Sequence, residues 1–176
     1  WAAQYTLGEA RHTAIIMAGN IPLVGSFDLR CALMAGHRVA VKPSSKDRAL
    51  TNYIIELLQD ISPSIPIEAY DEQTAYDMVI ATGSDLTAQH FRKRYASTPT
   101  LIRGSRHSVA VLAGDETQEE LQALQQDIFS YSGLGCRNIS LILLPEGCDL
   151  PLYPPHMGEM YRGTYRHTKA MRTMLG

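Results

Sequence analysis

The sequence predicts an α/β fold with an open parallel sheet flanked by helices. Short and nearly all-apolar runs at 13–18 (TAIIMA), 78–82 (MVIAT) and 108–112 (SVAVL) are typical of strands buried on both faces. Segments with helical periodicity separate these runs, and the connections are short. This order of strand, helix and strand indicates parallel strands joined by right-handed crossovers.

Composition excludes several other classes of protein. The chain has 176 residues, of which 45% are hydrophobic and 19% charged, and its formal net charge is −2. Lys and Arg are scattered, so nucleic acid is not an expected partner. No apolar run reaches the roughly 18–20 residues of a membrane span. Neither the three cysteines nor the six histidines have metal-ligand spacing, and we expect a cytoplasmic protein without a metal.

The first strand is followed by a turn and then by a helix. We expect Ser26 to cap this helix and Gly36 to stop it after Met34. Cys31 lies within its apolar periodic run, where structural cysteines are usually buried. The segment 37–42 (HRVAVK) is the second strand.

A second helix follows the second strand. Ser44 and Asp47 form a capping-box pattern at its start, prolines at 63 and 66 end it, and 65–70 is a weaker strand. The helix carries an apolar stripe with the spacing of a face that lies on a sheet. The stripe consists of Leu50, Tyr53, Ile54, Leu57 and Leu58.

The next strand, at 78–82, leads through Gly83 and Ser84 into a helix that extends to about Tyr95. The strand at 108–112 comes after this helix.

Asp115 and Gln118 form the next capping pattern, at the start of another helix. This helix ends near Ser132 and Gly133, and 139–144 (ISLILL) is a strand. The apolar side of the helix consists of Leu121, Leu124 and Ile128.

Polar residues follow three of the predicted strands. In open parallel sheets, ligands bind beyond the carboxyl ends of the strands. Asn20, the segment 42–45 (KPSS) and the pair Gly83-Ser84 all come directly after strands. We therefore expect them to gather on one rim of the sheet.

The segment 42–45 is a candidate phosphate site. Lys42, Ser44 and Ser45 supply an ammonium and two hydroxyls at a helix N-terminus, where free N–H groups and the helix dipole favour an anion. The alternative is that Ser44 only caps the helix and Lys42 is a solvated strand end, and local sequence alone favours this alternative. Gly83-Ser84 repeats the arrangement, but no GxGxxG fingerprint accompanies it.

Cys136 is a candidate nucleophile. It lies in the turn GLGCRN, where glycines leave room for a substrate and Arg137 favours the thiolate. Local features support a nucleophile and a small filler residue equally. Asn20 could donate a hydrogen bond to an oxyanion, although capping its own turn is the more common role of such a residue.

Five segments in a fixed order resemble the aldehyde dehydrogenase superfamily. They are IIMAGNIPLVG, GHRVAVKPSSKD, ATGS, SVAVL and GLGCRN. Within that superfamily the sequence is most similar to the LuxC-type acyl-CoA reductases, which are fatty-acid reductases. The segments GNIPLVG, KPSSKD and GLGCRN with the later PEG carry this closer resemblance, which spans roughly residues 13–150.

The resemblance implies roles for the candidate residues. Cys136 matches the nucleophile and Asn20 the oxyanion donor. Lys42 matches the lysine at the adenosine ribose. Ser45 falls where many NAD-using members have a glutamate, so NADPH is the expected cofactor, with NADH as the alternative. Ser44 belongs to the same cofactor segment, and Gly83 and Ser84 match the pair near the pyrophosphate.

One departure from the superfamily bears on the reaction. The segment 101–105 (LIRGS) corresponds to the stretch in which hydrolytic members carry a water-activating glutamate, and it has no carboxylate. The resemblance therefore implies reduction of an acyl-CoA, or another acyl thioester, to the aldehyde. It also implies a homo-oligomer and an acyl-protein synthetase or transferase as a candidate partner. The base that activates Cys136 is open, and His107 is the nearest candidate in sequence.

The expected domains follow from the same resemblance. Residues 1–114 are the expected nucleotide-binding domain, an aldehyde dehydrogenase-like open parallel sheet. Residues 115–176 are the expected partial catalytic domain, a truncated piece that carries Cys136. Two other functions stay open: a non-catalytic nucleotide-binding fragment, and a cysteine-dependent acyltransferase or thioesterase without a nicotinamide.

Overall fold

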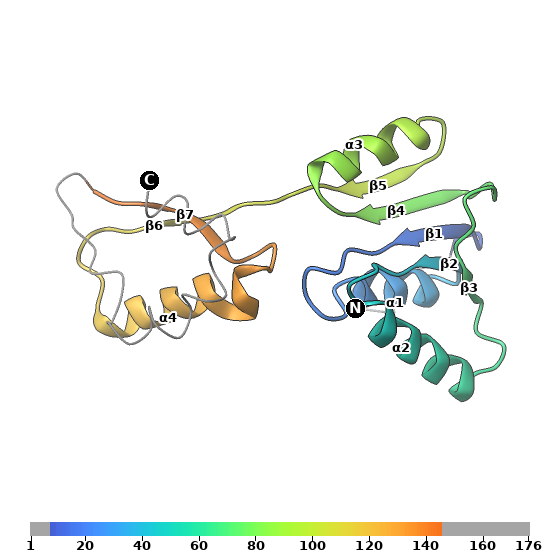
Figure 1. The fold of residues 1–176 in the computed structure, drawn as a ribbon, viewed down its shortest axis with the longest axis horizontal. Helices are drawn as coiled ribbons and strands as arrows, with labels where there is room; N and C mark the ends of the chain where they lie inside the picture. The colour runs from blue at the N-terminus through green and yellow to red at the C-terminus, as the bar shows by residue number, and fades with distance from the viewer. Residues whose placement is uncertain (1–7, 146–176) are drawn as a thin grey trace. The chain divides into compact units, whose positions relative to one another are not determined.

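The computed structural model describes residues 8–145 and divides the chain into two compact units, 1–105 and 106–176 (Figure 1). The boundary between the units falls between residues 105 and 106, whereas the sequence predicts a domain boundary between 114 and 115. The difference arises because the strand at 108–111 pairs with a strand of the second unit. Each unit is described by itself below.

The first unit is built on a five-stranded sheet with the order β3-β2-β1-β4-β5, and all its neighbouring strands are parallel. The strands are β1 (His12–Ile16), β2 (Arg38–Lys42), β3 (Ile67–Ala69), β4 (Met78–Thr82) and β5 (Thr100–Arg103). The helices are α1 (Ser26–Met34), α2 (Arg48–Ile61) and α3 (Asp85–Arg94).

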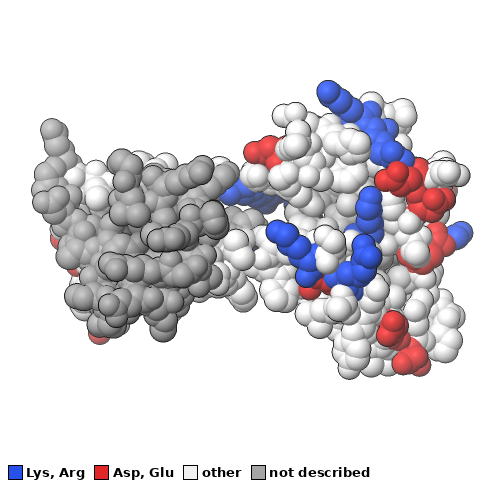
Figure 2. Space-filling view, in the orientation of Figure 1, with Lys and Arg blue, Asp and Glu red and all other residues white. Residues whose placement is uncertain are grey.

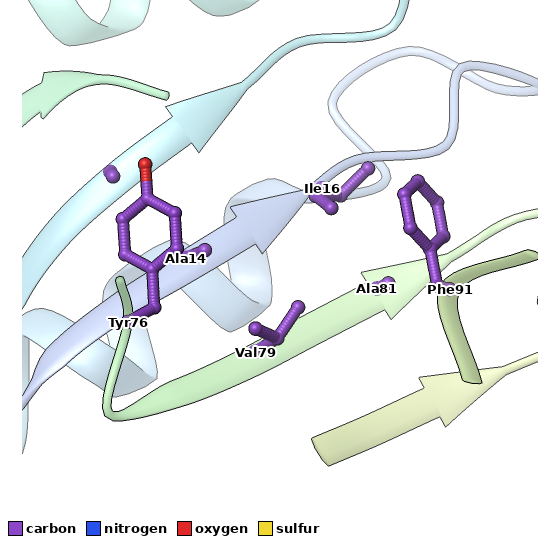
Figure 3. Packing of buried hydrophobic residues seen from close by; sticks show 7 residues of the cluster. Ala14, Ile16, Tyr76, Val79, Ala81 and Phe91 are labelled. Carbon is purple, nitrogen blue, oxygen red and sulfur yellow. The ribbon is translucent and has the colours of Figure 1, made fainter. Parts of the chain in front are cut away.

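The helices cover opposite faces of this sheet. Leu29 and Ala32 of α1, with Leu58 of α2, pack against Ile15 and Val41 on one face. On the other face Phe91 of α3 joins the cluster shown in Figure 3, whose strand residues alternate with those of the first cluster. That cluster consists of Ala14, Ile16, Ala40, Tyr76, Val79, Ala81 and Phe91.

The central strand explains why the sheet forms here. Thr13, Ala14 and Ile15 are at most 1% exposed, as expected for a strand covered on both faces. Burying one such isoleucine side chain stabilises the fold by about 1.5–3 kcal/mol. The predicted α/β class with a parallel sheet flanked by helices is confirmed.

The described part of the second unit, residues 106–145, forms a strand–helix–strand motif. Its elements are β6 (Ser108–Val111), α4 (Gln118–Phe129), a 3-10 turn (Ser130–Gly133) and β7 (Ile139–Leu143). β6 and β7 are parallel. Ile128 and Phe129 of α4 are buried, with Ile139 and Ile142 of β7 packed against them.

Strand β5 was not predicted. It lies at an edge of the sheet, and Thr100 and Leu101 are exposed. An edge strand of this kind lacks the all-apolar pattern of the central strands, so its sequence gives little signal.

Three predicted helix caps are wrong. The α1 helix has Gly25 at its N-cap, and the Ser26 hydroxyl instead donates to the Leu23 carbonyl. Ser44 does not cap α2, whose N-cap residue is Asp47. In α4 the capping box is formed by Thr117 and Glu120, rather than by the predicted pair Asp115 and Gln118.

Two burial predictions for these helices are also wrong. Leu50, Tyr53 and Leu57 are 39%, 60% and 43% exposed, because α2 turns Thr51, Ile55 and Leu58 toward the sheet. Apolar residues surround more of this helix than the sheet can cover. Cys31, predicted to be buried, is exposed.

Candidate functional site

The polar residues after the strands lie on one rim of the first sheet. All five strands are parallel, so the segments that follow β1, β2, β4 and β5 leave the sheet at the same edge (Figure 1). The backbone N–H of Met17 donates to the Lys42 carbonyl at 3.0 Å, and that of Gly83 donates to the Arg103 carbonyl at 3.1 Å. The rim predicted from the sequence is therefore present.

The loops after β1 and β2 are fastened to each other. The Leu23 N–H donates to Asp47 Oδ2 at 2.8 Å. A Cβ added to Gly19 would lie 2.3 Å from Ser44 Oγ, so only glycine fits there. These contacts hold the exposed residue Asn20 in a loop that lies against the segment 42–45.

The two serines of that segment differ in environment. Ser44 is half-buried against Gly19, and its hydroxyl accepts the Lys46 N–H at 3.3 Å. Ser45 is exposed. Ser45 is therefore the serine that is open to a ligand, and Ser44 shapes the loop.

Lys42 is held in a small charged and aromatic cluster. Its Nζ lies 5.1 Å from the centre of the Tyr70 ring and 3.4 Å from Glu72 Oε1. Tyr70 is stacked on Tyr76 and hydrogen-bonded to Tyr95. Burial raises the pKa of Tyr70, and the bond with Tyr95 acts in the same direction, so the Tyr70 ring beside Lys42 stays neutral.

Glu72 was not recognised from the sequence. It lies in the β3–β4 connection, 30 residues from Lys42, and β2–β3 pairing brings the two ends together. No local motif marks it. The only feature of the sequence that could have marked Glu72 as a rim residue is its position as a polar residue beyond the end of β3.

Gly83 and Ser84 form the start of α3. The Ser84 hydroxyl accepts the Thr87 N–H at 3.3 Å and caps the helix. A Cβ at Gly83 would lie 3.0 Å from Thr87 Cγ2, tighter than most real contacts. The backbone thus comes close to the first turn of α3, where unpaired N–H groups favour an anion.

Arg103 ends β5 within the segment 101–105. Its guanidinium donates to Asp28 Oδ2 in the first turn of α1 at 2.7 Å, and both side chains are largely covered. This rim position therefore holds a cation that is already paired with a carboxylate.

Cys136 lies in the second unit, in the turn just before β7, and is exposed. The turn is built around Asn138, whose Oδ1 accepts the Gly135 N–H at 2.7 Å and whose Nδ2 donates to the Asp127 carbonyl at 2.7 Å. A Cβ at Gly135 would lie 2.5 Å from Asn138 Oδ1. The glycine and the asparagine of GLGCRN thus hold the backbone on either side of the cysteine.

The backbone before Cys136 is strained. Tyr131 and Ser132 have φ of 53° and 58°, and a left-handed conformation costs a non-glycine residue about 1–2 kcal/mol. Such strain often accompanies functional turns. The rim residues and Cys136 belong to different units.

The rim carries hydrogen-bond donors of the kinds that can bind a dinucleotide. Lys42 offers an ammonium, Ser45 an exposed hydroxyl, and the Gly83–Ser84 turn a close backbone approach at a helix N-terminus. Figure 2 shows both signs of charge on the visible face of the first unit, with a group of Lys and Arg side chains near its middle.

Two other kinds of feature are absent from residues 8–145. Within these residues no group of three or more His, Cys, Asp or Glu side chains is arranged to hold a metal ion. In the same part of the chain, no helix has the length and apolar character needed to cross a membrane.

No family model matches the sequence, and no curated protein matches it. The first unit has an α/β fold with a parallel sheet flanked by helices, and solved structures identify the fold of the chain as that of aldehyde dehydrogenases. The chain is similar to Mycobacterium tuberculosis aldehyde dehydrogenase complexed with NAD+, with 19% identity and a TM-score of 0.61 over 88% of this chain and 33% of that one.

Two further structures agree. A putative aldehyde dehydrogenase from Burkholderia cenocepacia has 21% identity and a TM-score of 0.67 over 81% of this chain and 34% of its own. A 3,6-anhydro-L-galactose dehydrogenase in complex with NAP has 17% identity and a TM-score of 0.66 over 88% and 34%. At these identities the similarity establishes the fold, and the chain spans about a third of these solved proteins.

Proposed function

We propose that this chain belongs to an oxidoreductase that reduces an acyl thioester, such as an acyl-CoA, to the aldehyde with a nicotinamide dinucleotide. The observation that carries the proposal is the rim of the first sheet, because Lys42, Ser45 and the Gly83-Ser84 turn all lie at the same edge of a sheet in an aldehyde dehydrogenase fold. Neighbours with this fold were solved with NAD+ or NAP, which supports a nicotinamide cofactor.

Cys136 is the proposed nucleophile. Its thiolate attacks the thioester carbonyl, the C–S bond to CoA breaks, and the CoA thiolate leaves with the bonding electron pair. An exposed sulfur in a turn held by Gly135 and Asn138 supports this role. When bound, the nicotinamide supplies a hydride to the acyl carbon. The resulting thiohemiacetal on Cys136 then collapses, which releases the aldehyde and regenerates the thiolate.

Asn20 is the proposed oxyanion donor, and its exposed position in the loop after β1 supports this role. Removing one such donor typically lowers the rate by about 10²–10³-fold. The segment 101–105 corresponds to the stretch in which hydrolytic members carry a glutamate, and its lack of a carboxylate supports thioester reduction over hydrolysis. The carboxylate that contacts this segment through Arg103 is that of Asp28, and it is held in an ion pair with the guanidinium at 2.7 Å.

The choice between NADPH and NADH depends on the rim residues that would contact the adenosine ribose of the cofactor. Ser45 replaces a glutamate of many NAD-using enzymes, which favours NADPH, since a hydroxyl does not repel a 2′-phosphate. The carboxylate of Glu72 beside Lys42 favours NADH instead, because it would repel a 2′-phosphate.

The test is an assay of nicotinamide oxidation and aldehyde formation with a panel of acyl-CoAs, using NADPH and NADH separately. We expect equal amounts of oxidised cofactor and aldehyde. Cys136→Ala should abolish both, whereas Cys31→Ala should retain both, because Cys31 is the matched exposed cysteine of the first unit.

Other results in this assay would replace the proposal. Release of CoA without cofactor oxidation would identify an acyltransferase or thioesterase. Cofactor binding without turnover of any thioester would identify a non-catalytic nucleotide-binding fragment.

A further inference from the structure

The strongest unexplained feature of the rim is the carboxylate beside Lys42. Glu72 Oε1 lies 3.4 Å from Lys42 Nζ, and Glu72 Oε2 lies 3.8 Å from Arg94 Nη1. Arg94 also donates to the Glu72 backbone carbonyl at 2.8 Å. Glu72 therefore stands between two cations and stays 58% exposed, with its carboxylate open to solvent.

The loop that carries Glu72 is rigidly built. Asp71 Oδ1 accepts the Gln73 N–H at 3.3 Å, and Asp71 Oδ2 accepts the Thr74 hydroxyl at 3.0 Å. The buried Tyr76 hydroxyl pairs with both the N–H and the carbonyl of Asp71 at 2.9 Å. Because this backbone is fixed on both sides, the Glu72 carboxylate is presented at a defined place and not on a free loop.

Resting on the proposed function, we propose that Glu72 is the residue that selects the cofactor, by accepting hydrogen bonds from the adenosine ribose diol and repelling a 2′-phosphate. A carboxylate can accept both O–H groups of a vicinal diol, and carboxylates at the ends of neighbouring strands have this role in other dinucleotide-binding folds. Lys42, adjacent to Glu72, is the cation expected at the same ribose.

This inference reverses the expectation from Ser45. Ser45, just after β2, lacks the carboxylate that many NAD-using enzymes have at this position. Glu72, in the β3–β4 connection, brings a carboxylate to Lys42 instead. A dianionic 2′-phosphate would be attracted by Lys42 and Arg94 but repelled by Glu72. With Glu72 in place the unphosphorylated cofactor is favoured, and without it two unopposed cations remain.

The test measures binding and not turnover. NADH and NADPH are titrated separately into the full chain and its Glu72→Gln variant by isothermal calorimetry at low and high salt. Glu56→Gln is the matched control, because it removes the same charge from an exposed position on α2. Thermal unfolding of each variant checks that the fold is retained.

We expect the wild-type chain to bind NADH more tightly than NADPH. Glu72→Gln should shift the ratio of the two affinities toward NADPH by about tenfold, which corresponds to about 1.4 kcal/mol. That gain for NADPH should shrink at high salt, where exposed charges are screened. Glu56→Gln should leave the ratio unchanged.

Two results overturn the inference while leaving the proposed function intact: tighter binding of NADPH by the wild type, or an affinity ratio that Glu72→Gln leaves unchanged. If neither cofactor binds the wild-type chain, the proposed function fails, and the inference fails with it.

Discussion

The backbone N–H of Leu23 donates a hydrogen bond to the carboxylate of Asp47 at 2.8 Å and thereby fastens the loop after β1 to the start of α2. Asp47 also accepts the Thr51 hydroxyl at 3.3 Å. It is the N-cap residue of α2, but its side chain makes no capping bond to its own helix. The aspartate of the predicted capping box thus organises the rim instead.

Removing this carboxylate should loosen the rim. We expect Asp47→Ala to lower the free energy of unfolding by about 1.5–3 kcal/mol, the usual range for hydrogen bonds to a charged group. Urea unfolding measures the change, with Asp60→Ala on the exposed side of α2 as the control. Equal stability of Asp47→Ala and the control would refute the fastening role.

The contact between Gly19 and Ser44 gives a second prediction. Gly19→Ala should lower the unfolding free energy by about 1–3 kcal/mol, because the new methyl group would overlap Ser44 Oγ and Cβ, at 2.3 and 2.5 Å. Ser44→Gly should rescue Gly19→Ala. Ser44→Ala should rescue it poorly, since the Ser44 Cβ remains. A double-mutant cycle measures this coupling, and additive effects would contradict the packing described.

The third prediction concerns Glu68 near the amino ends of β1 and β2. The hydrogen bond from Arg38 holds the pKa of Glu68 below its usual value, and the bond with His12 acts in the same direction, while burial opposes both. A carboxyl with a lowered pKa in the folded state stabilises the fold above the unfolded pKa. That contribution is lost as the pH falls through the folded value.

The wild-type chain should therefore be more stable than Glu68→Gln at neutral pH. The difference should be constant down to about pH 5.5 and should shrink as the pH falls past the ordinary carboxyl value of 4.5. Urea unfolding of both proteins between pH 3 and pH 7 measures it. A difference that is independent of pH would show that the ionised pair does not act as described.

The sequence predicted the central strands because they are buried on both faces. Val39, Ala40 and Val41 of β2 are at most 3% exposed, so their apolar run carries a clear signal. The edge strand β5 has no such run and was missed. Local motifs were weaker guides to the caps, because Ser44 and Asp47 make contacts with the loop after β1 that a four-residue pattern does not reveal.

The candidate site likewise contains residues that the sequence could predict and one that it could not. The placement of Lys42, Ser45 and Gly83 on the rim could be predicted because each lies at or just after the end of a strand that the sequence marks. Glu72 could not, because its contact with Lys42 depends on β2–β3 pairing and on a loop ordered by Asp71. The roles of Cys136 and Asn20 stay predictions that rest on the resemblance.

The most direct test of the central claim is intact-protein mass spectrometry after incubation with an acyl-CoA and no nicotinamide. We predict one added acyl group on the wild type and on Cys31→Ala, mapped by peptide analysis to Cys136, and none on Cys136→Ala. The added group should disappear when NADH or NADPH is supplied. Acylation of Cys136→Ala to the wild-type extent, or no acylation of any protein, would contradict the claim that this sulfur carries the substrate.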